Sequence, residues 1–100
     1  MTSAQLTLAQ GRTADGTALL TATGEIDMSN SGRLADALDR LPGHVVIDLS
    51  GVEYLDSAGL NVLFARAERI ELIADALLRP VLTVSGLADL VPVRPAPDGR

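Results

Sequence analysis

The residues best able to do chemistry lie around Ser57, which follows Asp56 and precedes Gly59. A serine at a strand-to-helix junction is a common N-cap, because its oxygen accepts a hydrogen bond from a free backbone N–H group. The same hydroxyl could instead carry a phosphate, since a helix start favours an anion by roughly 0.3 to 1 kcal/mol. The phosphate would add about −1.5 to −2 charges beside Asp56 and Asp27. We expect a phosphate here to prevent binding at a docking surface without changing the fold of the domain.

Catalysis would require partners for these groups that the sequence does not supply. Asp27 and Asp56 lack a third residue at metal-ligand spacing, and a role as helix or turn caps is simpler. His44 precedes the next apolar strand and is expected at the end of that strand far from Ser57. No G-x-S-x-G elbow, Walker phosphate loop or dinucleotide fingerprint occurs. We therefore expect no enzymatic activity.

Gly59 has two interpretations. Glycine in the first turn of a helix relieves crowding against neighbouring side chains. Alternatively, the missing side chain lets the backbone or nucleotide of a partner approach Ser57.

The apolar pattern places these groups between a strand and a helix. Residues 45–49 are almost continuously apolar, which is typical of a strand covered on both faces and therefore central. A loop is expected at 50–56. After Leu60, apolar side chains recur at helical spacing, at Leu63, Phe64 and Ala67.

The preceding chain reads as a hairpin followed by a helix. Leu6 and Leu8 alternate with polar residues, Asp15-Gly16 is a favoured turn pair, and a second strand is expected at 18–22. Residues 24–27 are then expected to leave the sheet. Three neighbouring residues are candidate N-caps of the helix that follows: Ser29, Asn30 and Ser31. That helix carries one apolar face and ends at Pro42-Gly43, with apolar positions Leu34, Ala37, Leu38 and Leu41.

The stretch 70–84 fits two structures. Its apolar spacing continues the second helix, but that helix would exceed twenty residues in a domain of short elements. We favour a strand at 70–74 and a short third helix that ends before Gly86, with Pro80 in its first turn. Residues 94–100 offer little to bury and predict a disordered tail.

Composition limits the kind of partner. One hundred residues make one domain, and 47% hydrophobic residues suffice for a core. The chain has no cysteine and no apolar run near the roughly 20 residues of a membrane span, which together predict a cytoplasmic protein. A net charge of −5 argues against direct binding of nucleic acid and against membrane insertion. A protein partner is the expectation.

Three segments together carry a family resemblance: Gly24-Glu25-Ile26-Asp27, the strand at 45–49, and Asp56-Ser57-Ala58-Gly59-Leu60. With Ser85-Gly86-Leu87, they resemble the STAS domain family, specifically the bacterial anti-sigma factor antagonists, over residues 6–93. The resemblance implies an α/β fold with a small mixed β-sheet of four to five strands and three to four helices packed on it. It also implies a single domain at 1–93.

The resemblance further implies a phosphorylation switch at Ser57 without catalysis or a cofactor of the chain's own. The unphosphorylated form would bind an anti-sigma factor that is also a serine kinase, and so free the sigma factor. That kinase would use ATP to phosphorylate Ser57, and a PP2C-type phosphatase would restore the hydroxyl. The implied docking residues are Asp27, Ser29, Asn30, Ser31, Asp56, Ser57, Ala58, Gly59 and Leu60. The alternative is a constitutive docking subunit of a lipid or anion transport complex, a role that some family members serve.

Overall fold

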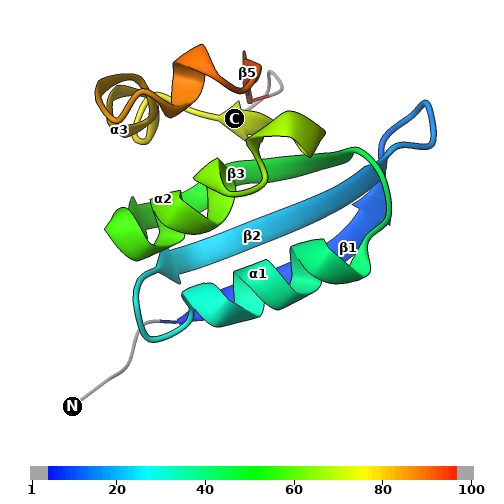
Figure 1. The fold of residues 1–100 in the computed structure, drawn as a ribbon, viewed down its shortest axis with the longest axis horizontal. Coiled ribbons are helices and arrows are strands. Elements are labelled where there is room, and N and C mark those ends of the chain that lie inside the picture. The colour runs from blue at the N-terminus through cyan, green and yellow to red at the C-terminus, as the bar shows by residue number, and fades with distance from the viewer. Residues whose placement is uncertain (1–4, 97–100) are drawn as a thin grey trace.

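Five strands form one mixed sheet in the computed structural model, which describes residues 5–96 (Figure 1). Their order in the sheet equals their order in the chain: β1 (Leu6–Arg12), β2 (Ala18–Ile26), β3 (Val45–Leu55), β4 (Ile70–Ala74) and β5 (Val93–Pro95). β1 runs antiparallel to β2, and every other neighbouring pair is parallel. β3 is therefore the central strand, as the continuous apolar run predicted.

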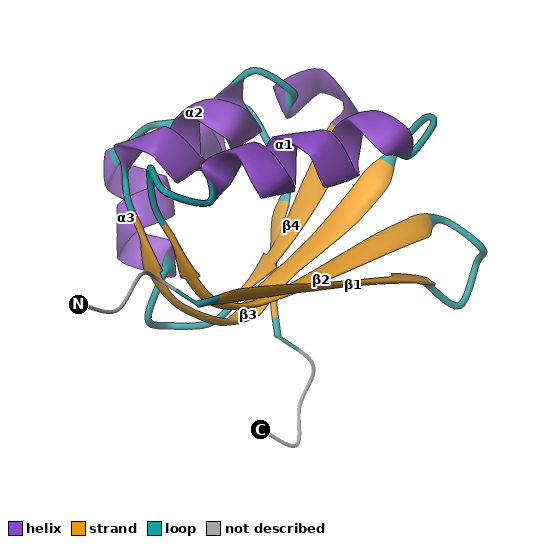
Figure 2. Cartoon of the chain, turned by 90° about the horizontal axis from the view of Figure 1, so that it is seen from below, coloured by secondary structure: helices purple, strands orange, loops and turns teal. Residues whose placement is uncertain are grey.

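Three α-helices and two short 3₁₀ helices connect the strands: α1 (Ser31–Arg40), α2 (Ser57–Phe64), α3 (Arg79–Val84), η1 (Ala67–Arg69) and η2 (Leu87–Asp89). α1 and α2 lie over the same face of the sheet (Figure 2). The mixed five-stranded sheet with three helices confirms the predicted fold class. No helix among residues 5–96 is long and apolar enough to span a bilayer.

The core forms between the sheet and these helices because side chains alternate along each strand. Val45, Ile47 and Leu49 belong to the core, where they join Leu34 of α1 and Leu63 of α2. Burying a leucine or isoleucine of this kind stabilises the fold by roughly 1.5–3 kcal/mol. The alternate positions of β3 and β4 face away from α1 and α2.

Two predicted boundaries are wrong because β2 and β3 are longer than expected. The predicted loop at 50–56 is strand up to Leu55, and residues 24–26 stay in the sheet instead of leaving it. The two extensions pair with each other, and the register shifts at Gly24/Glu25 as in a β-bulge. Gly24 has φ 106°, and a Cβ atom there would overlap the Gln5 carbonyl oxygen. The pairing therefore passes through a glycine that looks like a strand end in the sequence.

The remaining sequence predictions fare better. β4 spans the predicted strand at 70–74, and α3 ends before Gly86 with Pro80 in its first turn. The hairpin turns at Gly16, whose φ is 91°. The predicted disordered tail at 94–100 is wrong at its first two residues, which belong to β5 because they pair with β4. The predicted domain at 1–93 and the rest of that tail include residues 1–4 and 97–100, which lie outside the described residues.

Candidate functional site

Asp56 begins α2 and serves as its N-cap. Its Oδ1 accepts hydrogen bonds from the backbone N–H groups of Ala58 and Gly59, at 2.9 and 3.1 Å. These are donors that the helix itself cannot satisfy, so the carboxylate fixes where the helix starts. The prediction that an aspartate here is a cap is confirmed.

Ser57 is consequently the first residue of α2 and does not cap the helix. Its side chain is exposed, and its hydroxyl makes no hydrogen bond to the part of the chain that the structure describes. The interpretation of Ser57 as an ordinary N-cap is therefore wrong. Because Asp56 does the capping, the serine hydroxyl remains available to solvent at a helix start.

The loop between β2 and α1 forms around Asp27. The Asp27 Oδ1 accepts hydrogen bonds from the backbone N–H and the hydroxyl of Ser29, at 2.8 and 2.6 Å. The Asp27 carbonyl oxygen accepts from the N–H groups of Asn30 and Ser31. These bonds make a tight turn in which Ser29 is exposed and Ser31 is half-buried as the first residue of α1.

Asn30 has a different role from the one predicted. It holds the N-cap position of α1, but its side chain does not cap the helix. The Asn30 Oδ1 accepts from the Asp27 N–H at 3.0 Å, and its Nδ2 donates to the Glu25 carbonyl oxygen at 2.9 Å. With 6% exposure it is the one buried polar residue among those described. Asn30 therefore closes the loop from inside and offers little surface to a partner.

Asp56 also joins the two segments of the site. Its Oδ2 accepts from the Met28 N–H at 3.2 Å, and its own N–H donates to the Ile26 carbonyl oxygen at 3.1 Å. β2 and β3 are parallel neighbours, so the loops that follow them meet at the same edge of the sheet. The structure thus brings Asp27 and Asp56–Leu60 together, although about thirty residues separate them in the chain.

The three residues after Ser57 lie at different depths. Ala58 and Leu60 are partly exposed, whereas Gly59 is buried. A Cβ atom at Gly59 would lie 2.5 Å from Leu55 Cδ1 and 2.7 Å from Ile26 Cγ2. The absent side chain thus faces the core, which favours the interpretation of Gly59 as relief of crowding. Whether a partner contacts Gly59 stays a prediction.

Exposed apolar side chains extend the site beyond the predicted residues. Met28, between the two segments, is 82% exposed, and Tyr54 near the end of β3 is 52% exposed. Further along α2, Leu60 lines a shallow apolar groove of about 420 Å³ between α2 and α3, together with Pro80, Val81, Val84 and Ser85. Met28 could have been noticed in the sequence as an apolar residue between polar ones. The groove depends on how α3 packs, so no local sequence pattern predicts it.

The structure separates Ser57 from the histidine that a serine-based catalytic site would need. No three His, Cys, Asp or Glu side chains gather at a metal-binding distance within residues 5–96. His44 precedes the first residue of β3 and Ser57 follows its last, so the two stand at opposite ends of an eleven-residue strand. At about 3.3 Å per residue, such a strand is roughly 36 Å long. Ser57 therefore has no histidine within reach to act as a base.

Comparison with known proteins agrees with this geometry. The family model described as "Mlab, STAS domain" matches residues 9–92. The anti-sigma-F factor antagonist RsfB of Mycobacterium tuberculosis is 42% identical over 60 residues, which cover 56% of this chain and 49% of the relative. The chain thus spans about half the length of the curated relatives it matches.

Two solved structures extend the similarity to the whole fold. An anti-sigma factor antagonist from Mycobacterium paratuberculosis is 30% identical, with a TM-score of 0.84 over 94% of this chain and 89% of that one. The anti-sigma factor antagonist SpoIIAA in its unphosphorylated form has a TM-score of 0.73 over 92% of this chain and 90% of its own. Its sequence identity is 14%, so this second likeness concerns the fold alone.

Proposed function

Because the chain belongs to the STAS domain family, we propose that it acts as an anti-sigma factor antagonist whose binding is switched off by phosphorylation at Ser57. In this proposal the unphosphorylated protein binds an anti-sigma factor that is also a serine kinase, and so releases the sigma factor. The kinase uses its own ATP to phosphorylate Ser57, and a PP2C-type phosphatase reverses the reaction. The protein itself binds and does not catalyse.

One observation carries the proposal: the Ser57 hydroxyl is exposed and unbonded at a helix start that its neighbour already caps. A kinase can reach such a hydroxyl without unfolding α2. The Asp56 carboxylate keeps the Ala58 and Gly59 N–H groups occupied whether or not Ser57 is modified. Phosphorylation therefore changes the surface and leaves the helix start intact.

The phosphate acts on the partner through charge and hydration. It adds about −1.5 to −2 charges next to Asp56 and near Asp27. It also places a strongly hydrated group at the start of α2, next to Asp56, which binds exposed Met28, and three residues before Leu60, which lines the groove. An apolar partner surface seated over Met28 and Leu60 would have to strip that hydration, which costs several kcal/mol for an unpaired charge. Loss of binding follows without a change of fold.

The test compares three forms of the protein in binding to the anti-sigma factor encoded by the same organism. Ser57→Ala should bind like the wild type, and Ser57→Asp should bind at least about tenfold more weakly, because it adds a like charge to the docking surface. Gln10→Glu, which adds the same charge on exposed β1, should leave the affinity unchanged. Incubation with ATP and the anti-sigma factor should place phosphate on Ser57 and none on the alanine variant.

Equal affinity of the wild type, Ser57→Ala and Ser57→Asp would contradict the switch. That result would favour the alternative of a constitutive docking subunit in a lipid or anion transport complex. Co-purification with a membrane transporter, in place of an anti-sigma factor, would then be the decisive observation.

A further inference from the structure

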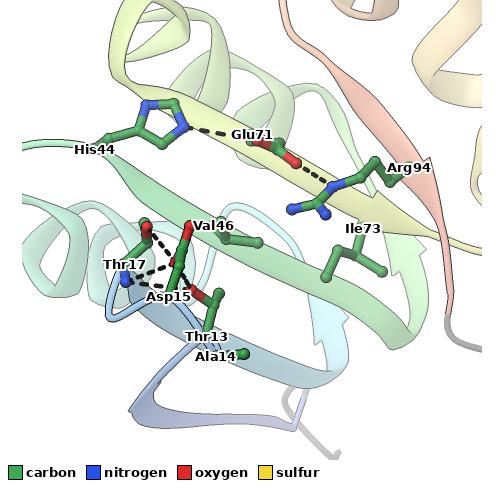
Figure 3. A pocket seen from close by; sticks show the side chains of 9 residues that line it. All are labelled: Thr13, Ala14, Asp15, Thr17, His44, Val46, Glu71, Ile73 and Arg94. Atoms are coloured by element: carbon green, nitrogen blue, oxygen red, sulfur yellow. Dashed lines mark hydrogen bonds and ion pairs between the residues drawn. The ribbon is translucent and has the colours of Figure 1, made fainter.

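A second concave site lies at the end of β3 opposite to Ser57. It is a hollow of about 470 Å³ on the sheet face turned away from α1 and α2, and its walls come from the β1–β2 turn and from β3, β4 and β5 (Figure 3). Val46 and Ile73 form an apolar floor, and Val46 is only 3% exposed. The volume falls within the roughly 300–1,000 Å³ of small-molecule sites.

One wall of the hollow is anionic. The Asp15 Oδ1 accepts hydrogen bonds from the Thr13 hydroxyl, the Thr17 hydroxyl and the Thr17 N–H, the last two at 2.8 and 3.1 Å. These bonds, chiefly the one from Thr13, lower the pKa of Asp15 to about 2. The Oδ2 has no hydrogen-bond partner within residues 5–96. A fixed carboxylate therefore keeps one free oxygen at the rim of the hollow.

The facing wall carries an arginine that is ion-paired with a glutamate. Glu71, whose side chain is 20% exposed, pairs through one oxygen with Arg94 Nε and through the other with His44 Nε2 at 3.8 Å. The shortest contact of this pair is made by the Nε of Arg94. The two terminal guanidinium nitrogens have no partner in the described part of the chain and remain free to donate. Glu71 thus orients a fork that can bind a carboxylate.

We propose that the hollow binds a small zwitterion of the amino-acid type. The ligand's ammonium group meets Asp15, its carboxylate meets the terminal nitrogens of Arg94, and its apolar side chain rests on Val46 and Ile73 (Figure 3). A simple anion would face the Asp15 and Glu71 carboxylates, and a simple cation would face Arg94. Only a ligand that carries both charges complements the two walls.

Titration of the isolated protein with free leucine tests the assignment by backbone amide NMR. Leucine should shift the amide signals of Thr17, Val46 and Ile73 in a saturable way. N-acetyl-leucine lacks the ammonium group and leucinamide lacks the carboxylate, so each should bind at least about tenfold more weakly, since each loses a charge-assisted hydrogen bond.

Matched variants separate the two walls. Arg94→Gln and Asp15→Asn should each weaken leucine binding about tenfold, and the asparagine keeps an acceptor oxygen for the turn. Arg79→Gln, at an exposed arginine outside the hollow, should bind as the wild type does. Thermal unfolding of each variant establishes that it is folded.

Three results would overturn the proposal: no saturable shifts up to the solubility of leucine, a blocked derivative that binds as tightly as leucine, or a loss of leucine binding in Arg79→Gln equal to that in Arg94→Gln. Ser57→Ala should bind leucine normally, because Ser57 follows the other end of β3. The outcome is therefore independent of the anti-sigma factor experiment, which needs a protein partner.

Discussion

Asp56 and Ser57 are neighbours, and either residue type can serve as the N-cap of a helix. Serine and aspartate are about equally good N-caps, so their order in the sequence does not say which one caps the helix. In the structure, Asp56 uses one oxygen for α2 and the other for the Met28 N–H. The aspartate thus holds the loop at 27–30 while the hydroxyl of the neighbouring serine stays free. The sequence motif identifies these two residues, but only the position at which α2 starts shows which of them caps the helix.

Asn30 provides a test of how the loop is held. Asn30→Ala removes both bonds of a buried side chain and leaves the Asp27 N–H and the Glu25 carbonyl oxygen unpaired. A fully buried unpaired group costs about 1–3 kcal/mol, and these two groups are partly buried, so the free energy of unfolding should fall by roughly 2–4 kcal/mol. Urea denaturation measures the change. Asn61→Ala, on the exposed face of α2, should stay within about 0.5 kcal/mol, and a similar loss in both variants would refute the assigned role.

Gly59 tests the packing behind Ser57. An alanine here gains helix propensity of up to about 1 kcal/mol, but its Cβ must displace Leu55 and Ile26 side-chain atoms. Overpacking of this kind costs about 1–3 kcal/mol, so we expect a net loss of roughly 1 kcal/mol in denaturant unfolding. Gly32 in α1 has no atom within 4 Å of an added Cβ, so Gly32→Ala should instead stabilise by about 0.5 kcal/mol. Stabilisation by both changes would show that Gly59 is not crowded.

At the scale of elements, the site depends on the lengths of β2 and β3. The sequence pattern predicted both strands but placed their ends too early. Within a single segment of sequence, Gly24 and Gly51 each look like the end of a strand. Each glycine is in fact required by close approach between the paired strands: a Cβ at Gly51 would lie 2.6 Å from Thr23 Cγ2. Such contacts depend on register, which a single segment does not encode. The longer strands carry the Asp27 and Asp56 loops to the same edge of the sheet.

The β1–β2 hairpin should show a distinct pH response through Asp15. Its pKa is lowered from 3.8 to about 2 in the folded protein, so its contribution to stability is complete above about pH 4 and is lost as the pH falls toward 2. Asp15→Asn should therefore unfold at lower urea concentration than the wild type at neutral pH, and the gap should close near pH 2. A gap that stays constant with pH would contradict this role of the carboxylate.

For the whole molecule, local sequence pattern predicted the type of element, whereas features that depend on the packing of distant segments were not predicted. The strand at 70–74 was distinguishable from a helix because a continuous helix would have been too long for the domain. The paired motifs at Asp27 and at Asp56–Leu60 marked the site. Three exposed apolar features were not predicted from the sequence: Met28, Tyr54 and the groove at Leu60. An apolar residue is normally expected in the core, and whether it is exposed depends on the packing of distant elements.

The bond between Asp56 and Met28 also sets an order of events during synthesis. The loop at 27–30 leaves the ribosome well before Asp56, and it lacks its anchor until that carboxylate and the N–H groups of α2 have emerged. Domains generally fold as units as the chain is made. A nascent chain that has exposed only β1, β2 and α1 therefore lacks part of the proposed docking surface, and we expect a partner to bind only the finished domain.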